Sequence, residues 1–128
     1  MKIMRKNTSP RYQRDDIISY LLVSEKTCGA ENLAITIVEM EPGGFQHLHS
    51  HEPEQMYFIL EGQGVMSVDG EERPVKTGDG IFFPSLAEHG LKNTGKGVLR
   101  YLSAASPSFT LEQSNEWWPL SPLDELEV

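Results

Sequence analysis

Short stretches in which apolar and polar residues alternate fill the middle of the chain. In residues 33–40, for example, Leu33, Ile35 and Ile37 fall at every second position. A period of two places these side chains on one face of a β-strand. The same kind of pattern predicts further strands at residues 17–24, 45–51, 55–60, 65–68, 73–77, 81–83, 89–93 and 98–104. No stretch predicts a helix longer than two turns, so the chain is expected to be an all-β sandwich or barrel.

Turn-forming residues separate these stretches. Asp69-Gly70 stands between two predicted strands, and this pair tolerates the positive φ angles of a type I′ hairpin turn. Pro74 lies within the strand that follows and has no backbone N–H to donate to a neighbour. That strand is therefore predicted to lie at the edge of a sheet or to contain a bulge.

The chain has 128 residues, the size of one domain with a core that needs no disulfide. We expect a β-barrel over residues 17–106, a basic N-terminal arm over 1–16, and an acidic C-terminal tail over 107–128 that packs on or beside the barrel. The pair Trp117-Trp118 is the largest apolar feature of that tail and is expected to cover apolar surface.

Charge is distributed unevenly between the two ends. The first 14 residues carry five basic residues and no acid, and the chain has no basic residue after Arg100. The ends are either two solvated segments or segments that attract each other, within a subunit or across a dimer. The formal net charge of −8 argues against nucleic acid as a partner, since such binding needs a basic surface.

The single cysteine, Cys28, cannot form an internal disulfide, which favours a reducing, cytoplasmic location. The N-terminal segment has no apolar run typical of a secretory signal. No apolar stretch approaches the roughly 18 residues that a membrane span requires, so we expect no membrane partner.

Three of the four histidines, His47, His49 and His51, alternate within five residues, and the fourth is His89. Two imidazoles at i and i+2 on one strand lie about 6.5–7 Å apart and can reach one metal ion. An alternating stripe of histidines on a protein surface would give the same spacing, so the spacing alone leaves both interpretations open.

Two longer patterns surround these histidines. Residues 43–62 match G-x5-H-x-H-x3,4-E-x6-G, except that Gln55 stands where glutamate is usual. Residues 78–93 match G-x5-P-x-G-x2-H-x3-N, except that Leu86 stands where glycine is usual. In order and separation these motifs resemble those of the cupin superfamily, specifically a small single-domain cupin.

The resemblance implies an all-β cupin double-stranded β-helix, or jelly-roll barrel, that holds one divalent transition metal. The metal could be zinc, manganese, nickel, iron or copper. By resemblance, the metal ligands are His49, His51, Gln55 and His89. His47 lies two positions before the motif and is either a pocket-lining residue, able to bind substrate or move a proton, or a structural or exposed histidine.

Glutamine at the fourth ligand position changes the charge of the site. Gln55 binds through a neutral carbonyl oxygen, so a divalent ion would keep a net charge of +2, which favours an anionic substrate or a metal-bound hydroxide. Glu54 would be a competing ligand, but the alternation points it away from the face that carries Gln55.

We therefore expect a metal-dependent enzyme, such as an isomerase or lyase, acting on a small sugar acid or other carboxylate. Tyr57 and His47 are the candidate catalytic acid or base. The alternatives are a non-catalytic cupin that binds or senses a small ligand, and an iron- or copper-dependent dioxygenase. Arg100 would either face inward and hold a carboxylate or face outward as a surface charge. The resemblance also implies a homodimer.

Overall fold

The computed structural model describes residues 1–120, and strands make up most of its regular structure. The strands are β1 (Arg11–Arg14), β2 (Ile17–Val23), β3 (Ala34–Met40), β4 (Glu54–Glu61), β5 (Gln63–Val68), β6 (Glu71–Lys76), β7 (Gly80–Phe83), β8 (His89–Asn93) and β9 (Leu99–Ser106). The helices are short: a 3₁₀ turn (Lys6–Thr8), α1 (Glu25–Cys28) and α2 (Leu111–Trp117). The predicted all-β class is confirmed.

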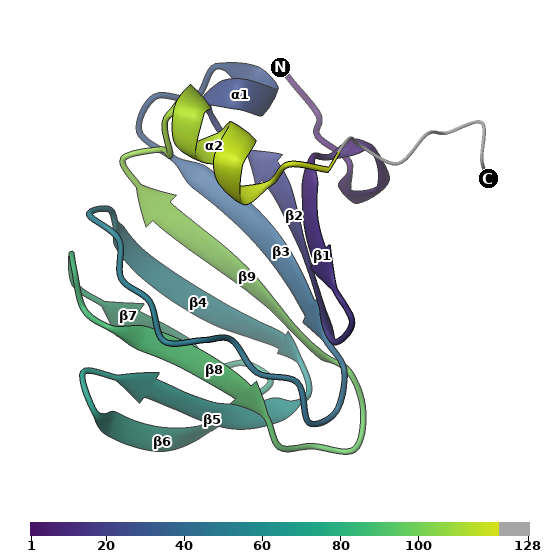
Figure 1. Cartoon of the computed structure of the whole chain (residues 1–128), viewed down its shortest axis with the longest axis vertical. Helices are drawn as coiled ribbons and strands as arrows, with labels where there is room; N and C mark the ends of the chain where they lie inside the picture. The colour runs from purple at the N-terminus through teal and green to yellow at the C-terminus, as the bar shows by residue number, and fades with distance from the viewer. Residues whose placement is uncertain (121–128) are drawn as a thin grey trace.

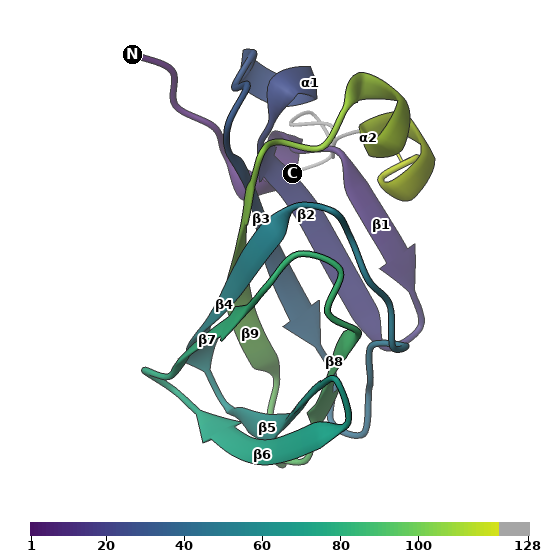
Figure 2. The ribbon, with the colours of Figure 1, turned by 90° about the vertical axis from the view of Figure 1, so that its left-hand side faces the viewer.

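The strands form two antiparallel sheets that enclose one barrel-like core (Figures 1 and 2). The larger sheet has the order β1-β2-β3-β9-β4-β7 and the smaller one the order β6-β5-β8. The segment between β3 and β4 runs along β8 and touches it through two isolated bridges, Phe45 to Lys92 and His49 to His89. This segment therefore extends the smaller sheet beyond β8.

The core lies between the inner faces of the two sheets. Gln55, Tyr57 and Ile59 of β4 are buried, whereas Phe58 and Leu60, on the opposite face of the strand, are exposed. The larger sheet also contributes Leu99 and Tyr101, and the smaller sheet contributes Met66 and Leu91. The alternation seen in the sequence therefore identifies correctly which side chains of β4 enter the barrel.

The prediction of a strand over residues 45–51 is wrong. These residues are extended but pair with β8 only around Phe45 and His49, so no continuous ladder forms. The strand β1 was not predicted, because its sequence, RYQR, has no buried residue and hence no apolar alternation. It forms because its backbone pairs with β2.

The predicted turn chemistry is confirmed. Asp69 and Gly70 have φ angles of 47° and 84° and join β5 to β6, as a type I′ turn requires. Pro74 lies in β6, which is an edge strand of the smaller sheet. One side of an edge strand faces no other strand, so a proline whose missing N–H lies on that side costs no ladder hydrogen bond.

The two ends of the described chain meet beside the larger sheet. Leu120 forms an isolated bridge with Arg11, and Trp118 packs with Leu21, Ala34 and other buried residues. The acidic residues Asp124, Glu125 and Glu127 lie outside the described residues, so attraction between the ends stays a prediction, as do the domain boundaries and the cytoplasmic location. Among residues 1–120, no helix is long and apolar enough to cross a membrane.

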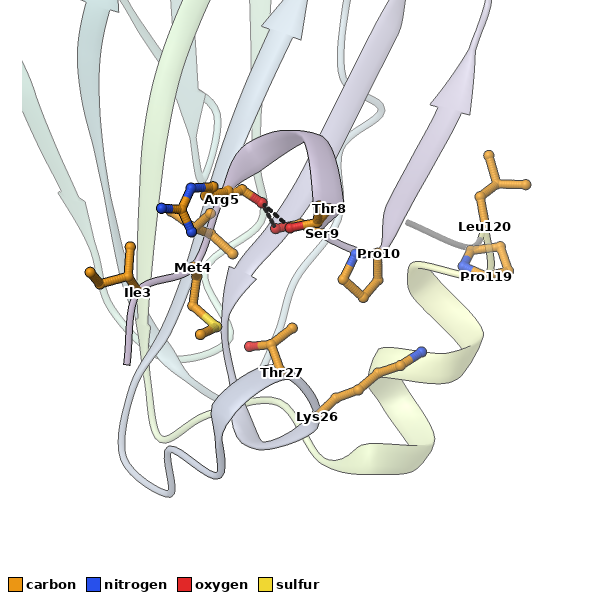
Figure 3. A pocket seen from close by; sticks show the side chains of 11 residues that line it. Ile3, Met4, Arg5, Thr8, Ser9, Pro10, Lys26, Thr27, Pro119 and Leu120 are labelled. Carbon is orange, nitrogen blue, oxygen red and sulfur yellow. Dashed lines mark hydrogen bonds between the residues drawn. The ribbon is translucent and has the colours of Figure 1, made fainter. Parts of the chain in front are cut away.

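A cavity of about 380 Å³ lies next to the N-terminal segment (Figure 3). Its lining includes Met4, Arg5, Lys26 and Leu120, and it contains none of the four histidines. The cavity is therefore separate from the histidine cluster described next.

Candidate metal centre

Three histidines from two distant parts of the chain meet inside the barrel. Each of His49, His51 and His89 offers a nitrogen, and these atoms all lie within 4.8 Å of one another. His49 and His51 lie in the segment that precedes β4, and His89 begins β8. The backbones of His49 and His89 exchange two hydrogen bonds, of 3.0 and 2.9 Å, and this pairing sets the separation of their side chains.

Hydrogen bonds to backbone carbonyls orient two of the rings. His49 Nδ1 donates to the His47 carbonyl at 2.8 Å, and His89 Nδ1 donates to the Ala87 carbonyl at 2.9 Å. Because a carbonyl can only accept, Nδ1 carries the proton in both rings and Nε2 keeps its lone pair. Fixing the ring through its second nitrogen is the usual way in which proteins orient a histidine ligand.

The environment keeps the cluster uncharged. Burial lowers the pKa of His89 to about 4. Burial, reinforced by the neighbouring histidines, lowers the pKa of His51 to about 4. Burial also lowers the pKa of His49. All three rings are therefore neutral near pH 7 and can accept a metal ion without first losing a proton.

Gln55 supplies an amide oxygen whose orientation is fixed by a hydrogen bond from the nitrogen of the same amide group. Its side chain is buried in β4, and its Nε2 donates to Ser103 Oγ at 2.9 Å. Gln55 Oε1 and His89 Nε2 are both buried and have no hydrogen-bond partner among the described residues. Such orphaned acceptors are costly unless a cation or water occupies the site. The donor set therefore fits a divalent metal, whereas Glu54 is exposed.

The turn between β7 and β8 supports two of the histidines at once. The N–H of Leu86 donates to the His51 carbonyl at 2.7 Å, and the carbonyl of Ala87 accepts from His89. Leu86 has a φ angle of 67°, in the left-handed region that favours glycine. This explains why glycine is usual at its position in the second motif.

Aromatic rings form the inner wall of the cluster. Phe83 lies 4.1 Å and Tyr57 lies 5.9 Å from the His89 ring, measured between ring centroids. The Tyr57 hydroxyl donates to Gln46 Oε1 at 3.0 Å, and burial raises the pKa of Tyr57 far above its usual value. Near neutral pH Tyr57 is therefore a phenol that donates a proton or hydrogen bond and not a phenolate base.

His47 is separated from the other three histidines. Its side chain is exposed and its ring packs edge-on against Phe45, with 5.0 Å between centroids. Its contact with the cluster is through its backbone carbonyl, which orients His49. A catalytic role for the His47 side chain stays a prediction.

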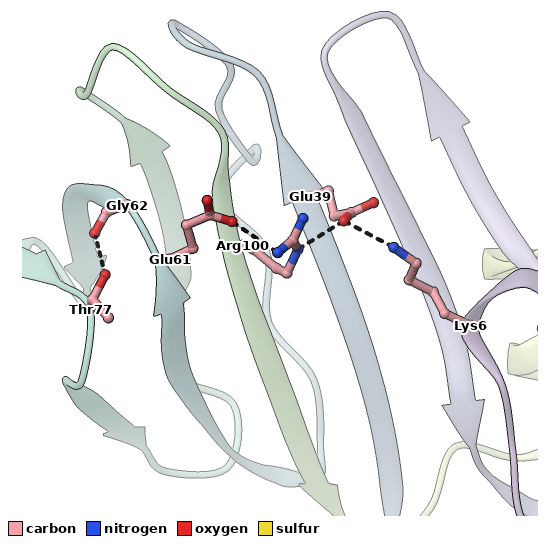
Figure 4. Close-up of polar contacts among 6 residues, drawn as sticks. All are labelled: Lys6, Glu39, Glu61, Gly62, Thr77 and Arg100. Carbon is pink, nitrogen blue, oxygen red and sulfur yellow. Dashed lines mark hydrogen bonds and ion pairs between the residues drawn. The ribbon is translucent and has the colours of Figure 1, made fainter.

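Arg100 faces outward. Its guanidinium group pairs with Glu39 and with Glu61, each at 2.8 Å, on the outer face of the larger sheet (Figure 4). Lys6 joins the same group through Glu39, at 3.2 Å. Arg100 therefore does not enter the barrel to bind a carboxylate.

Sequence analysis did not connect three residues with the cluster that they support. Phe109 and Trp117 lie against the His51 ring, with centroid distances of 5.7 and 5.1 Å. Ser103 orients Gln55 from β9. An alternating pattern in β9 places Ser103 on the inner face, but only the pairing of β4 with β9 brings it to Gln55.

Comparisons with known proteins agree with this architecture. The family model described as a cupin domain matches residues 36–105. The oxalate-binding protein of Thermotoga maritima is 39% identical over 67 residues, which are 52% of this chain and 55% of that protein. The dimethylsulfoniopropionate lyase DddW of Ruegeria pomeroyi is 30% identical over 88 residues, 69% of this chain and 58% of that protein. The matches thus span little more than half the length of these two curated relatives.

A solved structure is similar over nearly its whole length. The crystal structure of a predicted oxalate decarboxylase from Thermotoga maritima has a TM-score of 0.72 and 25% identity, and the match covers 83% of this chain and 99% of that one. The jelly-roll barrel expected from the motifs is therefore confirmed. Because the family model matches more than half of the sequence, the chain belongs to the cupin family.

Proposed function

We propose that this cupin binds one divalent transition-metal ion through His49, His51, His89 and the Oε1 atom of Gln55. The observation that carries the proposal is the pair of buried, unpartnered acceptors, His89 Nε2 and Gln55 Oε1, beside a cluster of neutral imidazoles. Imidazole nitrogens suit several transition metals, so zinc, manganese, nickel, iron and copper are all candidates.

The four ligands carry no charge, so the site would keep the full charge of the ion. A divalent ion bound there supplies a Lewis acid that binds and polarises the oxygens of an anion. Because Arg100 is paired on the outer face, its side chain does not compete for that anion inside the barrel. These features favour a small carboxylate as the ligand.

We propose further that the protein is an enzyme acting on such a carboxylate. The relatives support this class, since one is named for binding oxalate and another for cleaving dimethylsulfoniopropionate, both of them carboxylates. Tyr57 would act as a hydrogen-bond or proton donor from the inner wall, and His47 would act from the mouth of the barrel. A sugar acid also carries a carboxylate and is therefore a candidate substrate of the same class.

The second candidate function is binding without catalysis. It is favoured by the oxalate-binding relative and by the burial and pairing of Tyr57, which leave it no free base at neutral pH. The redox activity of the bound metal separates a third candidate, a dioxygenase: iron or copper would support it, whereas zinc would not.

Elemental analysis of protein purified without added metal tests the metal site. We expect about one transition-metal ion per chain in the wild type, and little in His49→Ala or His89→Ala. The matched control is His47→Ala, whose exposed side chain lies outside the cluster and whose metal content should be unchanged. Unchanged metal content in His89→Ala would refute the ligand assignment. Assays with small carboxylates then separate turnover from binding.

We also propose that the protein is a homodimer paired through the outer face of the larger sheet. Phe58, Leu60 and Phe82 expose 39%, 40% and 61% of their surface on neighbouring strands of that face. Contiguous exposed apolar side chains of this kind are typical of an interface.

A further inference from the structure

His51 is held in place differently from the other two histidines. His49 and His89 each donate a hydrogen bond from Nδ1 to a backbone carbonyl. Within residues 1–120 the His51 ring makes no hydrogen bond. Its support instead comes from two rings near the C-terminus, Trp117 at 5.1 Å and Phe109 at 5.7 Å between centroids.

These two rings belong to a segment that is anchored to the larger sheet. The segment follows β9 and forms α2, which begins with a capping box in which Thr110 and Gln113 exchange two hydrogen bonds of 3.1 Å. Trp118 is buried and its Nε1 donates to Ser19 Oγ at 2.9 Å. This anchoring leaves the adjacent Trp117 half-buried, against His51.

The contact has the geometry of a tilted stack, with 42° between the planes of Trp117 and His51. A stacked neighbour restricts the rotation of an imidazole while leaving both of its nitrogens free for a ligand. An imidazole bound to a divalent ion becomes more positive, and a positive group near an indole face is favoured. The contact should therefore stabilise the metal-bound ring more than the free one.

We propose that Trp117 is a positioning residue for the metal ligand His51, so that α2 is part of the metal centre. This inference rests on the proposed function. It assigns to the C-terminal helix the orienting role that backbone carbonyls have for His49 and His89. Phe109 completes the support, because its ring lies 5.4 Å from Trp117 as well as beside His51.

Zinc titration of chelator-treated protein by calorimetry tests the role. We expect Trp117→Leu to weaken zinc binding roughly tenfold, as is typical when a group that orients a ligand is removed. Trp117→Phe keeps an aromatic ring and should stay within about threefold of the wild type. The matched control is Leu111→Ala, an exposed position on the same helix, which should not change the affinity.

A second measurement separates positioning from a general loss of folding. In NMR spectra of the metal-free protein, the His51 ring protons should show a ring-current displacement that Trp117→Leu reduces, while the signals of the Tyr57 region stay in place. If the wild type binds zinc and Trp117→Leu binds it equally well, the positioning role is overturned and the metal site stands. If the wild type binds none of zinc, manganese, nickel, iron and copper, the proposed function is overturned together with this role.

Discussion

Replacing Leu86 with glycine should make the protein more stable, although the change removes a large side chain. Leu86 has a φ angle of 67°, and the left-handed conformation costs a residue with a Cβ atom about 1–2 kcal/mol. Glycine avoids this cost but loses about 0.5–1 kcal/mol in chain entropy. The Leu86 side chain is 63% exposed, so its removal sacrifices little packing. The net gain in unfolding free energy therefore lies between about 0 and 1.5 kcal/mol.

Leu48 provides a matched control. It is also a leucine near the histidine cluster, with 55% of its surface exposed, but its φ angle is not in the positive range. Leu48→Gly increases the conformational entropy that the chain loses on folding without relieving any backbone strain. Its unfolding free energy should therefore fall by about 1 kcal/mol. The two substitutions are chemically identical, so the opposite signs would isolate the contribution of the backbone at Leu86.

Urea denaturation of the metal-free variants, followed by circular dichroism, measures both changes. Unchanged m values would show that the surface exposed on unfolding stayed the same. The Leu86 N–H bond to the His51 carbonyl involves only the backbone, so zinc affinity should not fall in Leu86→Gly. If Leu86→Gly proves as destabilising as Leu48→Gly, the strain argument is refuted.

Three further predictions follow from the site and the outer face. Ser103→Ala removes the partner of Gln55 Nε2 and frees the amide to turn, so zinc affinity measured by calorimetry should fall roughly tenfold, and an unchanged affinity would exclude the orienting role. Burial lowers the pKa of His89 to about 4, from the 6.5 of an unperturbed histidine, so the unfolded chain takes up the proton first on acidification. His89 should therefore contribute about 2 kcal/mol to the fall in unfolding free energy of the metal-free protein from pH 7 to pH 5, so the fall should be less steep in His89→Gln; equal slopes in urea titrations would contradict this. Phe58→Glu combined with Phe82→Glu should convert the dimer to a monomer in light scattering, and a monomeric wild type would rule the dimer out.

Much of the fold could be predicted because it depends on local periodicity. The alternation in β4 identifies Tyr57 and Ile59 as core residues, and Asp69-Gly70 identifies the turn between β5 and β6. One strand was missed for a physical reason. Strand β1 has no apolar face, and its place in the sheet comes from backbone pairing with β2, which the side-chain pattern does not encode.

Two spaced motifs are enough to identify His49, His51, Gln55 and His89 as candidates for the metal centre. The way in which these side chains are held could not be predicted from the motifs, because it depends on the folded arrangement. The tautomers follow from carbonyl positions, the amide orientation follows from Ser103 on another strand, and the support of His51 comes from a helix more than 60 residues away. The outward orientation of the Arg100 side chain also depends on the fold, because its guanidinium group pairs with two glutamates from other strands. Spacing along a chain fixes which side chains share a face, whereas ring orientation depends on contacts between segments that only folding brings together.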